Sequence, residues 1–513
     1  MGVMPVASGQ YEKGLFRQLQ ETIDRMDREE KQHKEDIQKA ADLHRQRLDV
    51  MEAAHRQETA QLRQMLEAQG KVIAQLEKTI QLLREDNERL RSILNNDSNN
   101  SSQPPSADQK GKRTNTYNGR VKSERSKGAQ PGHRGTTLTR KDVEECIAAG
   151  KLQRKIVDHG QGPGKAVVKY VVDLSVTSHV TEHRFYPDST GKYSIPVELY
   201  SDVTYGETLR AIIVQLYGVG VVSNERIQSF IEGITGGEMK PSAGGIYGII
   251  RSFSDSVRGE MVHIVKCLLN QKVLYTDSTN INIDGKQAFI RNLSTAEEVL
   301  YTCMQHKNLQ SLGKMDVLPE FAGILTHDHE TALYHFGTQH GECNVHLLRH
   351  LTKNTEDTGH GWSQAMREFL CNANQARKQR IADGSVLTRE ELTQYSQAYD
   401  GICTQGETQN ADCSPKWAKK QERALLRRLR AYKENHLLFL YDNDVAFDNN
   451  LSERDLRKCK SRQKMSGGFR SLEGAQMYSR ILSLIETCKR RNRSPQSAIL
   501  AVLQGKRVWA ADG

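Results

Sequence analysis

The stretch VLYTDSTNINIDGK, from Val273 to Lys286, predicts a β-strand that carries an acid and ends in a turn. Its alternating, β-branched residues are typical of a strand, and Asp284 with Gly285 is a turn-forming pair. Asp277 lies inside the strand. A carboxylate within such an apolar strand is costly unless it lies at an edge or faces a cation.

The stretch FAGILTHDHETALYHF repeats this arrangement further along the chain. Its residues Phe321 to Leu325 predict a short apolar strand, and Asp328 follows at the carboxyl end. Functional groups collect at that end of the strands in ligand-binding sheets. Asp328 is therefore a second candidate site residue.

The stretch DNNLSERDLRKCKSRQK, from Asp448 to Lys464, predicts a basic helix after a polar turn. Asn449 and Asn450 are good N-caps, and Glu453 falls three residues after Asn450, where a capping-box glutamate reaches back to the cap. Capping alone explains Glu453 as well as metal binding does. The cationic residues that follow repel one another unless an anion offsets their charge. We expect DNA contacts from Arg454, Arg457, Lys458, Arg462 and Lys464.

Two strand-borne aspartates and one helix-borne glutamate suit a pair of magnesium ions. Hard cations prefer carboxylate oxygens, and two such ions can clamp the attacking and leaving oxygens of a phosphoryl transfer. Each acid is weak evidence alone, because surface carboxylates are common. Only the ordered set of Asp277, Asp328 and Glu453 carries the prediction.

Composition favours a polyanionic partner in a reducing compartment. The 513 residues allow several domains, and the net charge of +10 comes from 73 Lys and Arg against 63 Asp and Glu. The nine cysteines are scattered and odd in number, which points to the cytosol. The first residues lack the order of a signal peptide, and no apolar run approaches a membrane span. We expect a cytoplasmic protein with no membrane partner.

Residues 1–95 predict a coiled coil. Asn87 occupies an a position, where a buried amide favours a paired register. The alternative is an intramolecular hairpin with the weaker helical segment from Leu15 to Met51. A homodimer is favoured because apolar residues keep the heptad spacing in the last heptads. The seam consists of Leu62, Leu66, Ile73, Leu76, Ile80, Leu83, Leu90 and Leu94.

Three segments separate this coiled coil from the first candidate strand. Residues 96–137 form a basic linker that cannot fold alone. Residues 138–200 predict a small β-rich unit, whose best strand is VVKYVVDLSV, Val167 to Val176. Residues 201–265 predict helices and a candidate helix-turn-helix, although ordinary helical hairpins look the same. In the linker, cations that could neutralise DNA phosphates include Lys112, Arg113 and Arg134.

The segment between Asp328 and Glu453 is too long for a loop and predicts a helical insertion over residues 357–440. Thr388 and Glu391 make a capping box there. The insertion divides an α/β catalytic core into residues 266–356 and 441–495, followed by a tail over residues 496–513.

Cys343, His346 and His350 share one face of a predicted helix. A C-x-x-H pair can bind zinc, but this set offers few ligands for a closed site. We favour a supporting role beside the candidate acids for Cys343 and His346, together with Asn449 and Asn450.

Long motifs throughout the chain resemble transposases of the insertion sequence 66 family. They include NNSSQPPSAD (Asn99 to Asp108), GAQPGHRGTTL (Gly128 to Leu138), HDHETALYHFGTQHGECNVHLLRHL, and the terminal block that begins DNNLSERDLRKCKSRQKMSGGFRS. The resemblance implies a ribonuclease-H-like catalytic core with an Asp, Asp, Glu triad. On this chain the triad maps to Asp277, Asp328 and Glu453, which favours the metal-binding interpretation of Glu453. The family also has a Cys-x-x-His pattern followed by Arg, which fits Cys343, His346 and Arg349 and implies a supporting role for Arg349 beside the active site.

The resemblance further implies a DDE transposase that binds the ends of an insertion sequence and catalyses metal-dependent strand cleavage and strand transfer. The expected cofactor is a pair of Mg²⁺ ions, with Mn²⁺ as a substitute. Expected partners are double-stranded DNA at the element ends and target, a second copy of the chain, and accessory proteins encoded by the element. A bacterial, nucleoid-associated location follows. Two alternatives stay open: a non-catalytic DNA-binding protein, and a ribonuclease-H-like nuclease that cuts without joining.

The chain departs from the family in the region before the catalytic core. Many members carry cysteine-pair zinc motifs there, whereas this chain has Cys146 alone and YPDSTGK, Tyr186 to Lys192, near the expected pair. Too few thiolates and imidazoles remain for four-ligand binding, so we predict a degenerate zinc finger and no zinc. Asp277 is followed by Ser278 and Thr279 instead of the commoner Glu-Thr.

Overall fold

The computed structural model describes residues 14, 17, 20–29, 31–32, 48–97, 100–101, 138–159 and 167–509, with side chains from residue 59 onward in the helix that begins at Leu48. The chain divides into two compact units. Unit 1 comprises residues 1–112, 353–360 and 407–424, and unit 2 comprises the rest. Lys112, Arg113 and Arg134, predicted to contact DNA, lie outside the described residues.

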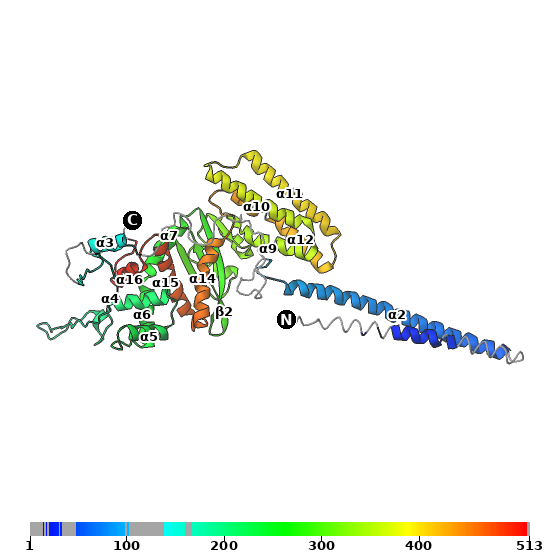
Figure 1. Cartoon of the computed structure of the whole chain (residues 1–513), viewed down its shortest axis with the longest axis horizontal. Coiled ribbons are helices and arrows are strands. Elements are labelled where there is room, and N and C mark those ends of the chain that lie inside the picture. Colours follow the sequence, from blue (N-terminus) through cyan, green and yellow to red (C-terminus); the bar gives the residue numbers. More distant parts are fainter. Residues whose placement is uncertain are drawn as a thin grey trace. The chain divides into compact units, whose positions relative to one another are not determined.

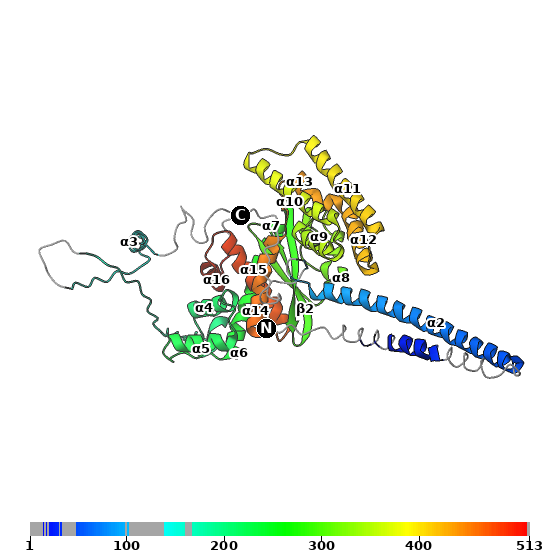
Figure 2. The same ribbon diagram turned by 45° about the vertical axis from the view of Figure 1, so that its right-hand side comes forward.

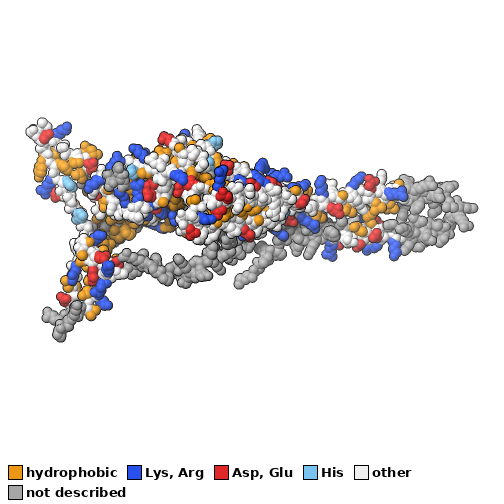
Figure 3. Space-filling view, turned by 90° about the horizontal axis from the view of Figure 1, so that it is seen from above, with side chains coloured by type: hydrophobic (Ala, Val, Ile, Leu, Met, Phe, Trp, Pro, Cys, Tyr) orange, Lys and Arg blue, Asp and Glu red, His pale blue; other side chains and the backbone are white. Residues whose placement is uncertain are grey.

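Unit 1 is dominated by the long helix α2 (Leu48–Leu94). Residues 20–29 form a second helix that lies alongside α2 in Figures 1 and 2, which is the hairpin alternative. Part of the predicted seam nevertheless stays open: Leu66 is exposed, and Leu94 is 75% exposed. Figure 3 shows hydrophobic side chains on the surface of this helix. Pairing with a second chain therefore stays a prediction.

The end of α2 is fastened to the last turns of α9 (Asn344–Thr358) within unit 1. Asn100 Nδ2 donates to Glu356 Oε2 over 2.6 Å, and Lys353 Nζ donates to the carbonyl oxygen of Ser92 over 2.5 Å. Unit 1 also contains the end of α11 (Arg389–Ala411) and the start of α12 (Lys416–Ala431). Several separate pieces of the chain thus meet near the base of the long helix.

Unit 2 is built around one five-stranded mixed sheet with the order β3-β2-β1-β4-β5. The first three strands pair antiparallel, and β4 and β5 continue the sheet in parallel with β1. Asp284 and Gly285 both have positive φ, +48° and +77°, which confirms the predicted turn and suits the twist of a hairpin. The strands are β1 (Val273–Ile283), β2 (Lys286–Ser294), β3 (Val299–Met304), β4 (Ile324–His327) and β5 (Gln339–Glu342).

Two groups of helices cover this sheet (Figure 1). The first shares a hydrophobic core with β1, β2 and β3, and it includes the helices predicted between residues 201 and 265. These helices are therefore part of the core and do not form a separate module. The group consists of α4 (Glu207–Gly218), α5 (Asn224–Ile234), α6 (Ala243–Ser256), α7 (Arg258–Leu269), α14 (Asn450–Ser466), α15 (Leu472–Arg490) and α16 (Pro495–Leu503).

The second core joins Val273 of β1 and Ile324 of β4 to the helices of the insertion. It includes the unit 2 residues of α9, α11 and α12, together with α10 (Gly361–Ala382) and α13 (Lys433–Tyr441). Helices do form over the predicted insertion. The capping box is confirmed, because the Thr388 N–H donates to Glu391 over 2.8 Å and the Glu391 N–H donates to Thr388 Oγ1 over 3.2 Å.

Helix α14 is attached to β1 at both of its ends. At its start, the side-chain amide of Asn449 donates to the carbonyl oxygen of Thr276 over 2.8 Å. At its end, Gly467 adopts φ +70° and Gly468 φ +128°, and a Cβ on Gly468 would lie 2.4 Å from the carbonyl oxygen of Asn282. The next residue, Phe469, donates its N–H to that oxygen over 2.8 Å. The glycines permit this approach because they have no Cβ.

Two predictions about the smaller segments are wrong. Within the described residues 138–159 and 167–200 there is a helix, α3 (Arg140–Ala148), and a 3-10 turn, η2 (Val197–Leu199), but no strand. Val171 in the expected strand is 93% exposed. Strand propensity depends on side-chain packing against neighbouring strands, and no described strand pairs with this segment.

The predicted C-terminal tail over residues 496–513 is also corrected. Most of its described part forms α16, whose Ile499 is fully buried, and Trp509 beyond it is 4% exposed. This segment completes the first core, because α16 packs against α4 and α15. No described helix is both long enough and apolar enough to cross a membrane.

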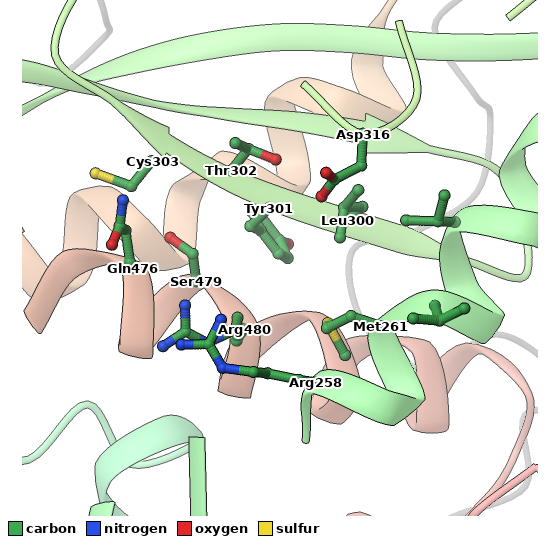
Figure 4. Close-up of a pocket in the computed structure, with 12 residues that line it drawn as sticks. Arg258, Met261, Leu300, Tyr301, Thr302, Cys303, Asp316, Gln476, Ser479 and Arg480 are labelled. Carbon is green, nitrogen blue, oxygen red and sulfur yellow. The ribbon is translucent and has the colours of Figure 1, made fainter. Parts of the chain in front are cut away.

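A cavity of about 570 Å³ lies beside the edge strand β3 (Figure 4). Residues of α7, β3 and α15 line it, including Arg258 and Arg480, with Asp316 on the opposite side in the figure. None of the three predicted triad acids contributes to its lining.

Candidate active site

Asp277 lies in β1, and Asp328 directly follows the neighbouring parallel strand β4. The last paired residues of β1 and β4 are Tyr275 and Thr326. Asp277 lies two residues after Tyr275, and Asp328 lies two residues after Thr326. Side chains alternate between the two faces of a sheet, so the two aspartates share the same face. The sheet therefore directs the two carboxylates to the same region.

Glu453 reaches the site from the first turns of α14, and the capping interpretation is wrong. The N-cap is Asn449, whose side chain makes no capping bond, and Asn450 is the first helical residue. The Glu453 N–H donates to the Asn449 carbonyl oxygen over 3.2 Å, which is an ordinary helical bond. Asp448 accepts the Asn450 N–H over 3.1 Å instead. The Glu453 side chain is thus not used for capping.

A buried acid on the same helix fixes its position, and sequence reasoning missed it. Asp455 accepts hydrogen bonds from Ser294 Oγ at 2.7 Å and from Asn292 Nδ2 at 3.3 Å, both on β2. Arg490 of α15 lies 2.5 Å from its other oxygen. The available signal was a pair of polar residues, Asn292 and Ser294, on one face of a strand that is otherwise apolar there.

His346 of α9 lies between two of the acids. Its Nδ1 is 3.0 Å from Asp328 Oδ2, and its Nε2 is 3.2 Å from Glu453 Oε1. One ligand atom from each of the three residues lies within 4.8 Å of the others. Glu453 Oε1 is buried, and apart from the His346 imidazole it has no hydrogen-bond partner among the described residues. Such an atom fits a cation ligand, because buried polar atoms are otherwise hydrogen-bonded.

The electrostatics of the cluster favour added positive charge. Burial and the neighbouring Asp328 raise the pKa of Asp277 to about 6. Burial also raises the pKa of Asp328, although His346 opposes this, and Glu453 raises it further. The hydrogen bond with His346 lowers the pKa of Glu453. Burial alone would lower the pKa of His346, but Glu453 and Asp328 together raise it.

The predicted supporting residues separate into those beside Asp328 and those away from it. The Asn449 side chain, fully buried, lies 3.4 Å from Asp328 Oδ1, and the Asn449 N–H donates to Cys343 Sγ over 3.3 Å. The charge of Arg349 helps to lower the pKa of Glu453, after the larger effect of His346. Asn450 and His350 are both exposed.

The basic side chains of α14 serve different purposes. Arg454, Arg457 and Lys464 are exposed, whereas Lys458 forms an ion pair with Glu486 of α15. Arg462 is buried, and its prediction as a DNA contact is corrected.

The burial of Arg462 has a clear cause. Its guanidinium donates to the carbonyl oxygen of Val222 over 3.0 Å and lies 4.5 Å from the ring centre of Tyr217. A second ring, that of Tyr478, lies 5.5 Å away. These cation–π and hydrogen-bond contacts use the charge of Arg462 inside the protein.

Comparison with known families gives two matches. Residues 202–477 match the sequence model of the Transposase IS66 family, and this range is more than half of the chain. It contains Asp277, Asp328 and Glu453. Residues 44–139 match a family of unknown function (DUF6444). A search of curated proteins found no match.

Proposed function

We propose, from the premise that the chain belongs to the Transposase IS66 family, that it binds the ends of an insertion sequence, cuts DNA strands there and joins them to target DNA. The observation that carries the proposal is that His346 lies between Asp328 and Glu453, while Asp277 stands on the neighbouring parallel strand and its pKa is raised by the charge of Asp328 after the larger effect of burial. The mixed sheet that bears them is compatible with a ribonuclease-H-like core.

Asp277, Asp328 and Glu453 would hold two Mg²⁺ ions, with Mn²⁺ as a substitute. The buried oxygen of Glu453, which has the His346 imidazole beside it, and the raised pKa values of both aspartates support this assignment. Bound divalent ions would supply activation of a water and stabilisation of charge on the phosphate oxygens. Asn449 and Cys343 hold Asp328 in place, and His346 keeps Asp328 and Glu453 together.

The exposed cations of α14 would hold the DNA backbone. Arg457, Lys460 and Lys464 follow Glu453 by four, seven and eleven residues, which places all four on one face of the helix. The charge of Lys460 contributes to the lowered pKa of Glu453, after His346 and Arg349. Arg454 is a neighbouring exposed cation. Phosphates along this face would lead a strand to the acids.

The seam of α2 would pair two chains so that two element ends are held together. Exposed leucines such as Leu66, Leu83 and Leu94 support this, because they leave apolar surface open to a second chain. The basic linker over residues 96–137 would add salt-dependent affinity that is independent of sequence.

The test uses the full chain and DNA that carries the inverted repeats flanking its gene. Asp277→Asn, Asp328→Asn and Glu453→Gln should each abolish strand cleavage, while DNA binding in a gel-shift assay survives. Asp383→Asn, a change at an exposed aspartate between α10 and α11, is the matched control and should cut normally.

Each other outcome has a defined meaning. A triad variant that still cuts removes that residue from the triad. Binding without any cutting by the unaltered chain favours a non-catalytic DNA-binding protein, and cutting without joined products favours a nuclease.

A further inference from the structure

A second cluster of metal-ligating side chains lies in unit 1, and the proposed function does not use it. His360 stands between α9 and α10, Cys413 stands between α11 and α12, and Glu422 lies on α12. One ligand atom from each lies within 4.8 Å of the other two. All three residues belong to the same unit.

The cluster is buried, and its carboxylate is held firmly. Glu422 is 0% exposed and Cys413 is 8% exposed. His360 Nδ1 lies 2.8 Å from Glu422 Oε1 and 3.1 Å from Oε2. The side-chain amides of Asn354 and Asn410 donate to the two oxygens over 3.0 and 2.9 Å. Hydrogen bonds of this kind orient metal-binding carboxylates in proteins.

The donor types identify the ion. A thiolate sulfur, an imidazole nitrogen and a carboxylate oxygen are all zinc ligands, whereas Mg²⁺ and Ca²⁺ prefer oxygen throughout. Three protein ligands leave one tetrahedral position for water. We propose that His360, Cys413 and Glu422 bind one zinc ion.

A zinc ion there would fasten helix ends at the base of α2. His360 and Cys413 come from two separate junctions between helices and Glu422 comes from α12, so the ion would cross-link segments far apart in the sequence. The same unit holds the end of α2 through Asn100 to Glu356 and Lys353 to Ser92. The ion would therefore stabilise the attachment of the long helix.

This proposal departs from the expectation of no zinc. That expectation considered ligands close together in the sequence, ahead of the catalytic core. His360, Cys413 and Glu422 lie within and at the edges of the helical insertion, and only folding brings them together.

The first test uses cobalt as a spectroscopic substitute for zinc. The full chain, stripped with a chelator and titrated with Co²⁺, should bind one equivalent with a thiolate-to-cobalt charge-transfer band in the near ultraviolet, and Zn²⁺ should remove the band. Cys413→Ser should lack the band, whereas Cys146→Ser, at a half-buried thiol in α3, should keep it. No band in the unaltered chain, or an unchanged band in Cys413→Ser, would overturn the proposal.

The second test separates this site from the proposed catalytic acids. The double variant Asp328→Asn, Glu453→Gln should keep the cobalt band at full intensity. His360→Gln changes a partly exposed side chain, so its helical circular dichroism should be retained while Co²⁺ binds more than about tenfold more weakly. Loss of the band in the double variant, or unchanged affinity in folded His360→Gln, would contradict a zinc site at these residues.

Discussion

Two carboxylates at the ends of neighbouring parallel strands, the buried Glu342 and the half-buried Asp328, differ in the positive charge around them. Glu342, the last residue of β5, is contacted by Arg428 at 2.6 Å, by His329 at 2.8 Å and by His436 at 3.2 Å. Asp328, just after β4, has an imidazole, an amide and a thiol beside it, and two further acids influence the same cluster. Glu342 is thus surrounded by donors, whereas Asp328 has fewer donors and lies near other acids.

The pKa values follow this difference. Burial alone would raise the pKa of Glu342, but hydrogen bonds from His329 and His436 and the charge of Arg428 lower it well below the ordinary value. The pKa values of Asp277 and Asp328 are both raised, with burial as the first cause. A buried acid whose charge the protein itself offsets is structural, whereas a half-buried acid that lacks nearby positive charge suits a cation from solution.

The largest expected effect is the loss of magnesium binding in Asp328→Asn. We expect MgCl₂ to raise the thermal midpoint of the unaltered chain, because an ion that binds only the folded state stabilises it. The variant should require more than about 100-fold more Mg²⁺ for the same rise. Thermal unfolding over a MgCl₂ series measures this, with Glu342→Gln as the control that keeps the normal dependence. If MgCl₂ raised the thermal midpoint of Asp328→Asn as much as that of the unaltered chain, Asp328 and Glu342 would not differ in magnesium binding.

The next effect is on stability, in Glu342→Gln. Removing the charge leaves the side chain of Arg428, mostly buried, without its ionic partner, and the free energy of unfolding should fall by about 3 kcal/mol. Urea unfolding at pH 7 measures the change. An exposed substitution such as Glu390→Gln serves as the control.

The same variant has a predicted pH dependence. Because the pKa of Glu342 is lowered in the folded state, its contribution is fully present above the ordinary value of 4.5. It is lost as the pH falls through the lower folded value. The difference between Glu342→Gln and the unaltered chain should therefore be constant near neutral pH and shrink in acid. A difference that grows in acid would reverse the assigned sign.

A smaller effect is expected from Asn449→Ala. This change removes the amide that links Thr276 to Asp328, so magnesium affinity should fall by about tenfold and stability by about 1 kcal/mol. Asn450→Ala, at the exposed neighbour, should leave magnesium affinity unchanged. Calorimetric titration with MgCl₂ measures both. Equal affinities in the two variants would show that Asp328 needs no such support.

The smallest expected effect is on DNA binding, and it compares the exposed Arg457 with the buried Arg462. Arg457→Ala should lower the slope of log binding constant against log salt concentration by about 1, with stability unchanged. Arg462→Ala should lower the thermal midpoint and leave the slope alone, because Arg462 is satisfied inside the protein. Fluorescence anisotropy with labelled end DNA over a salt series checks the pair. A changed slope in Arg462→Ala would restore its predicted DNA contact.

Sequence reasoning succeeded where the signal is local. The turn at Asp284 and Gly285 depends on backbone preferences, and the capping box of Thr388 and Glu391 depends on a spacing of three residues. The strand that carries Asp277, the strand that ends just before Asp328 and the helix that carries Glu453 were recognised in the same way, while the role of the three acids stays a prediction.

The failures share a dependence on tertiary contacts. The segment Val167 to Val176 has strand-like residues but no described partner strand, and Arg462 looks like its exposed neighbours until Tyr217 is packed beneath it. Asp455 resembles a surface acid in the sequence, although Ser294 and Arg490 enclose it. Burial of a polar residue is decided by distant segments, which a local pattern does not contain.

The attachment of α14 to β1 at both ends gives the proposed site a fixed frame. The strand carries Asp277 and the helix carries Glu453, while Asn449 joins them at one end and Phe469 at the other. Sliding the helix along the strand would break both connections at once. The acids are therefore held in register before any cation or DNA arrives, so little reorganisation is needed when they bind. If the chain cuts DNA as proposed, control over cutting would depend on which DNA reaches these acids, and the acids themselves would need no separate activation.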